Sequence, residues 1–203
     1  MKKLYEIDNK IKVKNVNDLV ETPVVIRVNS FDETSAKEFS EQMSKAHNTG
    51  QPFIPIVIDS YGGQVYSLIA MIEEIQSSKL PIATICMGKA MSCGSVLLTC
   101  GTEDMRFIAP NSTVMVHDVS SMHGGKNEEL KSSAKQTDKL QKQIFHLMAK
   151  NCKQNVNYFL DLIHEKSHAE WYLDATEAKK HNMVNHIRVP SMTVKVGLDI
   201  TLD

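Results

Sequence analysis

Ser92 and His117 are the residues whose types and settings best suit nucleophilic catalysis. Ser92 lies in the segment GKAMSCG (residues 88–94), in which a predicted strand ends and a predicted helix begins. The first turn of a helix presents free N–H groups and a partial positive charge, which suit a developing oxyanion. His117 ends an apolar strand pattern, and neutral histidine is the usual general base for a serine nucleophile. By themselves the two positions also fit a helix-capping serine and a hydrogen-bonded core histidine, so both interpretations stay open at this point.

Two glycines, Gly62 and Gly63, follow an earlier predicted strand. Their N–H groups could bind a substrate carbonyl, because small residues let the backbone approach a ligand closely. A tight turn uses the same residues and is the commoner outcome of this spacing.

The segment HEKSH (residues 164–168) is a literal H-E-x-x-H pattern. On a helix, His164 and His168 would lie on one face as zinc ligands, with Glu165 as the base. The segment stands at the end of a helical pattern and lacks the G-x-x-H extension of longer zinc motifs. We therefore favour solvent-exposed histidines and predict no metal site.

Composition excludes several classes of protein. The chain has 203 residues, with 23 Lys and Arg against 24 Asp and Glu, a formal net charge of −1. A near-neutral chain has no electrostatic footprint for nucleic acid or an anionic membrane. No apolar run approaches the ~18 residues of a membrane span, and the first residues lack the apolar stretch of a signal peptide, so we expect a cytoplasmic protein. Because no C-x-x-C pair occurs, we expect reduced, mostly buried thiols at Cys86, Cys93, Cys100 and Cys152.

The predicted strands and helices alternate along the chain, which is the pattern of an α/β fold with a mostly parallel sheet. Strands are predicted over 5–13 (a hairpin), 23–28, 53–58, 82–87, 107–109, 114–117 and 171–173. Helices are predicted over 34–50, 65–75, 90–98, 127–152, 156–163 and 176–181. The long helix over 127–152 carries one apolar stripe on an otherwise charged surface. Residues 192–202 alternate between apolar and polar, which predicts a strand that covers a sheet edge.

Five segments between residues 54 and 187 match the motifs of one family in order. GKAMSCG is similar to the motif G-x-A-x-S-M-G, and MVH (residues 115–117) is similar to M-I-H. RFIAPNS (residues 106–112) resembles R-x-x-x-P-N-S, and IDSYGG (residues 58–63) resembles N-S-P-G-G. YLDATEA (residues 172–178) resembles F-M-S-A-x-E-A. Together the segments resemble the Clp protease proteolytic subunit family, the ClpP serine peptidases.

The resemblance implies a mechanism of acyl transfer through an acyl-enzyme. Ser92 would be the nucleophile and His117 the general base. The backbone N–H groups of Gly63 and Cys93 would form the oxyanion hole. The family has Asp just before F-M-S-A, where this chain has Glu170, so Glu170 would complete the triad.

Other positions matter to the comparison with the family. Asp174 is the second candidate for the acid. Asp118 is a poor one, because adjacent residues of a strand point to opposite faces and it cannot easily orient His117. Gly124 and Gly125 would mark the strand that pairs with a peptide substrate through backbone hydrogen bonds, a few residues later than the family pattern.

The family also implies a fold and an assembly. We expect the α/β spiral of ββα units of the ClpP/crotonase superfamily, with residues 127–152 as a protruding handle helix. A single peptidase domain would span 1–203, with a divergent region over 1–50, the family-like core over 54–187 and a strand extension over 190–203. The family forms stacked heptameric rings that degrade unfolded polypeptides. A Clp-type ATPase unfoldase docks on the region that corresponds to 1–50, and the low resemblance there leaves this partnership open.

Our hypothesis is a homo-oligomeric serine endopeptidase that needs no cofactor and cleaves unfolded polypeptides inside a chamber. The first alternative is a catalytically inactive ring subunit, which the presence of Glu170 in place of Asp motivates. The others are a crotonase-type acyl-CoA enzyme, which also uses backbone oxyanion holes, and a zinc peptidase with His164 and His168 as ligands.

Overall fold

The computed structural model describes residues 2–5, 11–12, 23–120, 124–166, 169–191 and 196–197. The strands are β1 (Lys2–Tyr5), β2 (Ile11–Lys12), β3 (Ile26–Val28), β4 (Ile54–Ser60), β5 (Ile82–Met91), β6 (Arg106–Ile108), β7 (Thr113–Val116), β8 (Trp171–Leu173), β9 (His186–Ile187) and β10 (Val196–Gly197). The helices are α1 (Glu33–Asn48), α2 (Val65–Ser77), α3 (Cys93–Thr99), α4 (Asn127–Asn151), α5 (Tyr158–Glu165) and α6 (Ala175–Lys180).

Seven of the described strands form one sheet, in which β3, β4, β5, β6 and β9 lie side by side in that order. All four of these pairings are parallel. β7 runs parallel to the end of β5, and β8 pairs antiparallel with β7. The prediction of an α/β fold with a mostly parallel sheet is confirmed.

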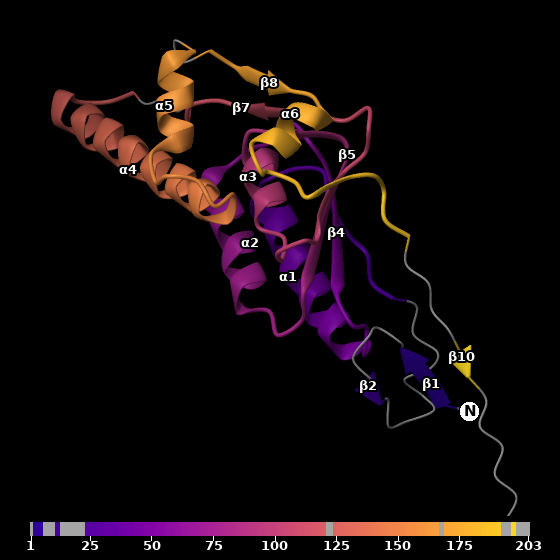
Figure 1. The fold of residues 1–203 in the computed structure, drawn as a ribbon. Coiled ribbons are helices and arrows are strands. Elements are labelled where there is room, and N and C mark those ends of the chain that lie inside the picture. The colour runs from indigo at the N-terminus through magenta and orange to yellow at the C-terminus, as the bar shows by residue number, and fades with distance from the viewer. Residues whose placement is uncertain are drawn as a thin grey trace, which may run out of the picture.

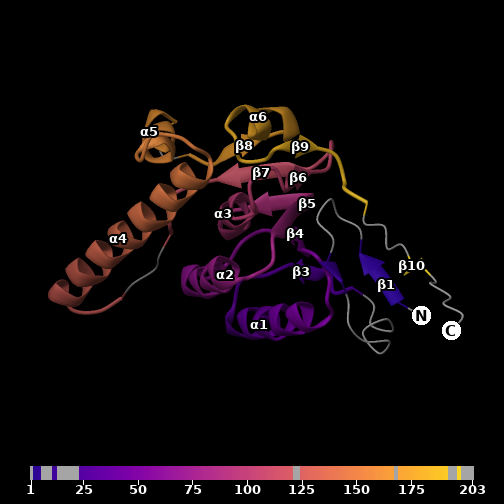
Figure 2. The ribbon, with the colours of Figure 1, turned by 60° about the horizontal axis from the view of Figure 1, so that its bottom comes forward.

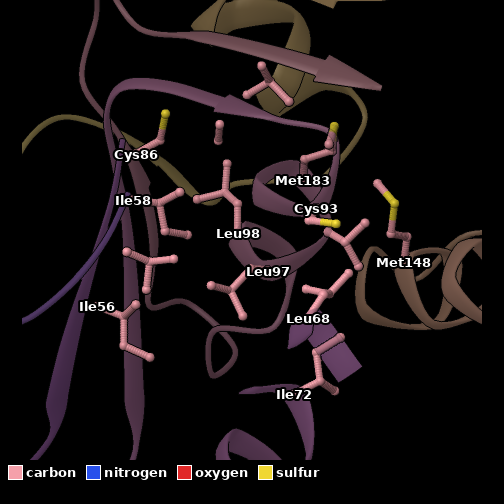
Figure 3. Packing of buried hydrophobic residues seen from close by; sticks show 14 of the residues in the cluster. Ile56, Ile58, Leu68, Ile72, Cys86, Cys93, Leu97, Leu98, Met148 and Met183 are labelled. Atoms are coloured by element: carbon pink, nitrogen blue, oxygen red, sulfur yellow. The ribbon is translucent and has the colours of Figure 1, made fainter. Parts of the chain in front are cut away.

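The main core lies between β3–β5 and the helices α1, α2 and α3, with α4 passing beyond α3 (Figures 1 and 2). Ile56 and Ile58 of β4 face Leu68 of α2 and Leu97 of α3, and Met148 of α4 closes the side of this layer (Figure 3). All five side chains are fully buried. Burying an aliphatic side chain of this size contributes about 1.5–3 kcal/mol, so this apolar layer fixes the places of α2, α3 and α4 on the sheet.

A bend at Gly88 divides β5 into two halves. Residues 84–86 pair with β6, whereas residues 89–91 pair with β7. Gly88 has a φ of +101°, and a Cβ added there would meet the carboxylate of Asp59 at 2.8 Å. The Gly88 N–H donates to Ser112 Oγ at 2.8 Å, which holds the bend against the turn before β7. Glycine at position 88 therefore allows β5 to bend, so that it pairs first with β6 and then with β7 before it ends at Met91.

Helix α4 is packed over only part of its length. Its second half buries Leu140, Ile144 and Met148 in the core. Its first half extends away from the sheet, and Leu130 there is 39% exposed (Figure 2). The predicted apolar stripe is therefore confirmed for the second half alone, and the protruding handle helix is present.

The helix predicted over 90–98 begins later than expected, at Cys93. Ala90 and Met91 are good helix formers, but the pairing of residues 89–91 with β7 keeps them extended. The hairpin predicted over 5–13 is confirmed by the antiparallel pairing of β1 with β2. Most of the strand predicted over 192–202 lies outside the described residues, although Val196–Gly197 pairs with β1. Among the helices that the structure describes, none is long and apolar enough to cross a membrane.

His181 makes the fold sensitive to acid. Its ring lies edge-on to Trp171, with 4.8 Å between the ring centroids, and its Nδ1 is 2.8 Å from Tyr158 Oη. Burial disfavours the charged ring and lowers the pKa of His181 below its ordinary value. The unfolded chain then binds the proton more readily than the native one, so the free energy of unfolding falls as the pH drops below about 6.5.

We expect the melting temperature to decrease between about pH 8 and about pH 5. The decrease should be smaller for His181→Gln, whose amide keeps an acceptor for Tyr158 but takes up no proton. Thermal unfolding of both proteins across this range checks the prediction. Equal slopes in the two proteins would contradict it.

Candidate active site

Ser92 stands at the junction of β5 and α3 in a strained backbone conformation. Its φ of 52° and ψ of −120° are unusual for a residue with a side chain. Although Ser92 is the N-cap of α3, its side chain makes no capping hydrogen bond. Instead its Oγ lies 2.8 Å from Nε2 of His117. The interpretation of Ser92 as a plain helix cap is therefore wrong.

The pairing of β5 with β7 brings His117 to Ser92. Met91 lies opposite Met115, and the Ser92 N–H donates to the Met115 carbonyl at 2.9 Å. His117 follows β7 directly and so lies beside the residue that follows β5. A serine hydroxyl in contact with an imidazole nitrogen can lose its proton as it attacks, which is the arrangement of an activated nucleophile.

Two backbone N–H groups beside Ser92 are open to a ligand. In the described part of the chain, neither the Gly63 nor the Cys93 N–H donates to a protein acceptor. The next amide along, that of Gln64, donates to the Phe31 carbonyl at 2.7 Å and holds the Gly63 segment in place. The two residues also contact each other, because the Cys93 thiol donates to the Gly63 carbonyl at 3.3 Å. Burial raises the pKa of Cys93 to about 11, so the thiol keeps its proton at neutral pH.

A pocket of about 50 Å³, lined by both polar and apolar residues, opens beside this pair. Its aliphatic and aromatic lining residues are Val65, Leu68, Val96, Val116, Val119, Ile144 and Phe145. Gln141 of α4 fixes the segment after His117, because it accepts from the Val119 N–H at 2.9 Å and donates to the Asp118 carboxylate at 2.8 Å. The pocket can therefore receive an apolar group next to Ser92.

Glu170 lies just before β8 and is exposed. β7 and β8 pair antiparallel with Val116 opposite Trp171, so the next step of this register places His117 and Glu170 at facing positions. The Glu170 carboxylate accepts a hydrogen bond from the Tyr172 hydroxyl at 2.6 Å. Among the described residues, His117 has one hydrogen-bonding side chain, that of Ser92. Glu170 thus lies across from His117 without contacting it through a hydrogen bond.

Asp174, the second candidate acid, caps α6. Its carboxylate accepts from the Glu177 N–H at 2.8 Å, and the Glu177 side chain accepts from the Asp174 N–H at 3.0 Å. This capping box gives Asp174 a role in the helix start.

The sequence matches the family model for Clp protease over residues 8–191.

The chain belongs to the Clp protease family.

The fold is accordingly that of the ClpP/crotonase superfamily, and by family the chain is a ClpP-like protease. The match begins well upstream of residue 54, where the motif resemblance begins.

The other candidate residues from the sequence are two glycines, Gly124 and Gly125, and two histidines, His164 and His168. Gly124 and Gly125 lie directly before α4, and at Gly125 the φ of +147° favours glycine. Neither glycine belongs to a described strand, and their pairing with a peptide substrate stays a prediction. His164 lies in the last turn of α5, whereas His168 is outside the described residues. The described residues contain no group of three or more His, Cys, Asp or Glu that could hold a metal ion.

No motif or pattern in the sequence indicates a role for three residues that shape the site: Ser112, Gln141 and Tyr172. Ser112 lies in the RFIAPNS segment, but a motif match does not reveal which groups a hydroxyl contacts. Gln141 and Tyr172 resemble solvent-facing residues of a helix and a strand. Their partners come from other elements or depend on strand geometry, so no local signal distinguishes them.

A substitution at Gly62 tests whether the close approach of the backbone to Ser92 requires glycine. Its φ is +105°, and an added Cβ would lie 2.6 Å from Ser92 Cβ. We expect Gly62→Ala to displace the Ser92 side chain and to slow the labelling of Ser92 by a fluorophosphonate by about 10²-fold or more. Gly94→Ala is the matched control, because its Cβ would meet nothing closer than the Ser60 carbonyl at 3.5 Å. Similar labelling rates for the two variants would refute this account of Gly62.

Proposed function

We propose that this chain is a serine endopeptidase in which Ser92 attacks the peptide bond and His117 acts as general base. The observation that carries the proposal is the 2.8 Å contact between Ser92 Oγ and His117 Nε2. The strained backbone of Ser92 supports it, because such strain persists mainly where function requires a fixed geometry.

In the proposed reaction, Ser92 Oγ attacks the carbonyl carbon of the peptide while its proton passes to His117 Nε2. The negative charge that develops on the carbonyl oxygen is stabilised by the N–H groups of Gly63 and Cys93. His117 then gives the proton to the leaving amine, which departs and leaves an acyl-enzyme on Ser92. Water, deprotonated by His117, hydrolyses this ester, and the proton returns to Ser92.

Glu170 completes the triad in this proposal. A carboxylate that accepts the Nδ1–H of His117 holds the ring in the correct tautomer and stabilises the imidazolium. The β7–β8 register supports Glu170, since it places this residue across from His117. Asp174 is already engaged as the cap of α6.

The proposed substrate is an unfolded polypeptide, and the proposed assembly is a homo-oligomer of stacked rings. The family generally forms oligomeric rings. The first half of α4 supports this for the present chain, because it extends from the sheet with Leu130 exposed. A closed ring chamber would admit only polypeptides that are already unfolded. This proposal holds whether or not a Clp-type ATPase unfolds them first.

One observation favours a second candidate, a catalytically inactive ring subunit. Glu170 is hydrogen-bonded to Tyr172, and within the described residues it makes no hydrogen bond to His117. A histidine without its acid is a poorer base, so the subunit would then serve the assembly alone.

Removing the nucleophile separates the two candidates. We expect the wild type to cleave a short fluorogenic peptide and Ser92→Ala to lose several orders of magnitude in kcat. A fluorophosphonate should label the wild type alone, and size-exclusion chromatography should give both proteins the same oligomer. Cleavage at equal rates by both would refute the serine mechanism, and rings without labelling would favour the inactive subunit.

Replacing each acid tests which one serves His117. We expect Glu170→Gln to lower kcat by about 10²- to 10⁴-fold, because an amide cannot stabilise the imidazolium. Asp174→Ala should instead lower the free energy of unfolding by about 0.5–2 kcal/mol, the usual cost of losing an N-cap. Peptidase kinetics and chemical denaturation of both variants measure the two effects. The reverse pattern would move the triad to Asp174.

A further inference from the structure

Tyr172 makes one polar contact that the proposed mechanism leaves unexplained. Its hydroxyl donates to Glu170 Oε2 at 2.6 Å, a short hydrogen bond to a carboxylate. The side chain is 53% exposed, so packing alone does not account for its position. The bond to Glu170 raises the pKa of Tyr172 above its ordinary value, which keeps the hydroxyl protonated at neutral pH.

The strand geometry puts Tyr172 on the side of β8 that bears Glu170. Side chains alternate along a strand, and here Trp171 and Leu173 are buried while Glu170 and Tyr172 are exposed. Directly opposed residues of an antiparallel pair point to the same face. By the register, His117 therefore shares a face with Glu170 and Tyr172.

We propose that Tyr172 is a positioning residue that holds the Glu170 carboxylate beside His117. The inference rests on the proposed function and deepens it. Tyr172 occupies one carboxylate oxygen, Oε2, and leaves Oε1 to accept the Nδ1–H of His117. In this role Tyr172 acts through Glu170 and has no part of its own in the reaction.

The hydrogen bond from Tyr172 restricts the orientations of the long Glu170 side chain. Glutamate has one more rotatable bond than aspartate, so an exposed Glu170 has more orientations in which it misses His117. A hydrogen bond from the same strand removes many of them. The family motif matched by residues 172–178 begins with Phe, which has no hydroxyl, so this chain departs from the pattern at both positions of the contact.

The test is a double-mutant cycle of Tyr172→Phe and Glu170→Gln, with kcat and KM measured across the pH range on the assembled protein. We expect Tyr172→Phe to lower kcat by about 3- to 10-fold, the effect of one hydrogen bond, with little change in KM. Its pH profile should change in the same direction as that of Glu170→Gln, because both variants remove the carboxylate from its place beside His117. In the Glu170→Gln background, Tyr172→Phe should cause no further loss.

Tyr61→Phe is the matched control. It removes the hydroxyl of a tyrosine that is also exposed, while Lys89 keeps its position 4.3 Å above the ring. We expect its kcat and pH profile to equal those of the wild type, and thermal unfolding should show all variants folded.

Three outcomes would overturn the role of Tyr172. These are an unchanged kcat in Tyr172→Phe, an equal loss with and without Glu170, and a raised kcat, which would mean that Tyr172 withholds Glu170 from His117. Failure of the proposed function differs from all three, because activity would then survive in Ser92→Ala, or the wild type itself would neither cleave the peptide nor be labelled by the fluorophosphonate.

Discussion

The bend of β5 at Gly88 is the constraint on which the site depends. Ahead of it the strand pairs with β6, and beyond it residues 89–91 pair with β7. Only because β5 changes its neighbour do the residues that follow β5 and β7 meet, which brings Ser92 Oγ to 2.8 Å from His117 Nε2. Ser112 holds the bend through the Gly88 N–H, so a hydroxyl outside the Ser92–His117 pair supports the geometry of that pair.

The strain at Ser92 is held in place by what surrounds it. An unusual backbone conformation of this kind costs about 1–3 kcal/mol. On one side, the Ser92 N–H donates to β7, and on the other side α3 is buried along its whole length. The buried face of α3 cannot move without opening the core. The serine therefore keeps a conformation that frees its hydroxyl from capping α3 and turns it toward His117.

The Glu170 side chain is held by fewer contacts than Ser92. Trp171 and Leu173 fix β8 against the core, and with it the position of the Glu170 backbone. The Glu170 side chain itself is exposed, and its orientation depends on one hydrogen bond from Tyr172. Buried strand pairing thus sets the positions of Ser92 and His117, whereas the Glu170 side chain is set at the surface. The orientation of Glu170 is for that reason the part of the site most open to change.

Hydrophobic periodicity and short motifs are local properties of the chain, and they were enough to predict the α/β class, most of the elements, and the candidates Ser92, His117 and Gly63. They misplaced the start of α3, since residues 89–91 are kept extended by β7, a partner more than twenty residues away. A family motif includes Ser112 but does not indicate what its hydroxyl contacts. No motif or pattern in the sequence indicates the contacts of Gln141 and Tyr172. Three features follow from the three-dimensional arrangement alone. Ser92 contacts His117 and does not cap its helix, Asp174 caps α6, and Glu170 lies opposite His117 while bound to Tyr172. Each of these depends on which strands lie side by side, and strand pairing is a non-local choice that no stretch of sequence encodes alone.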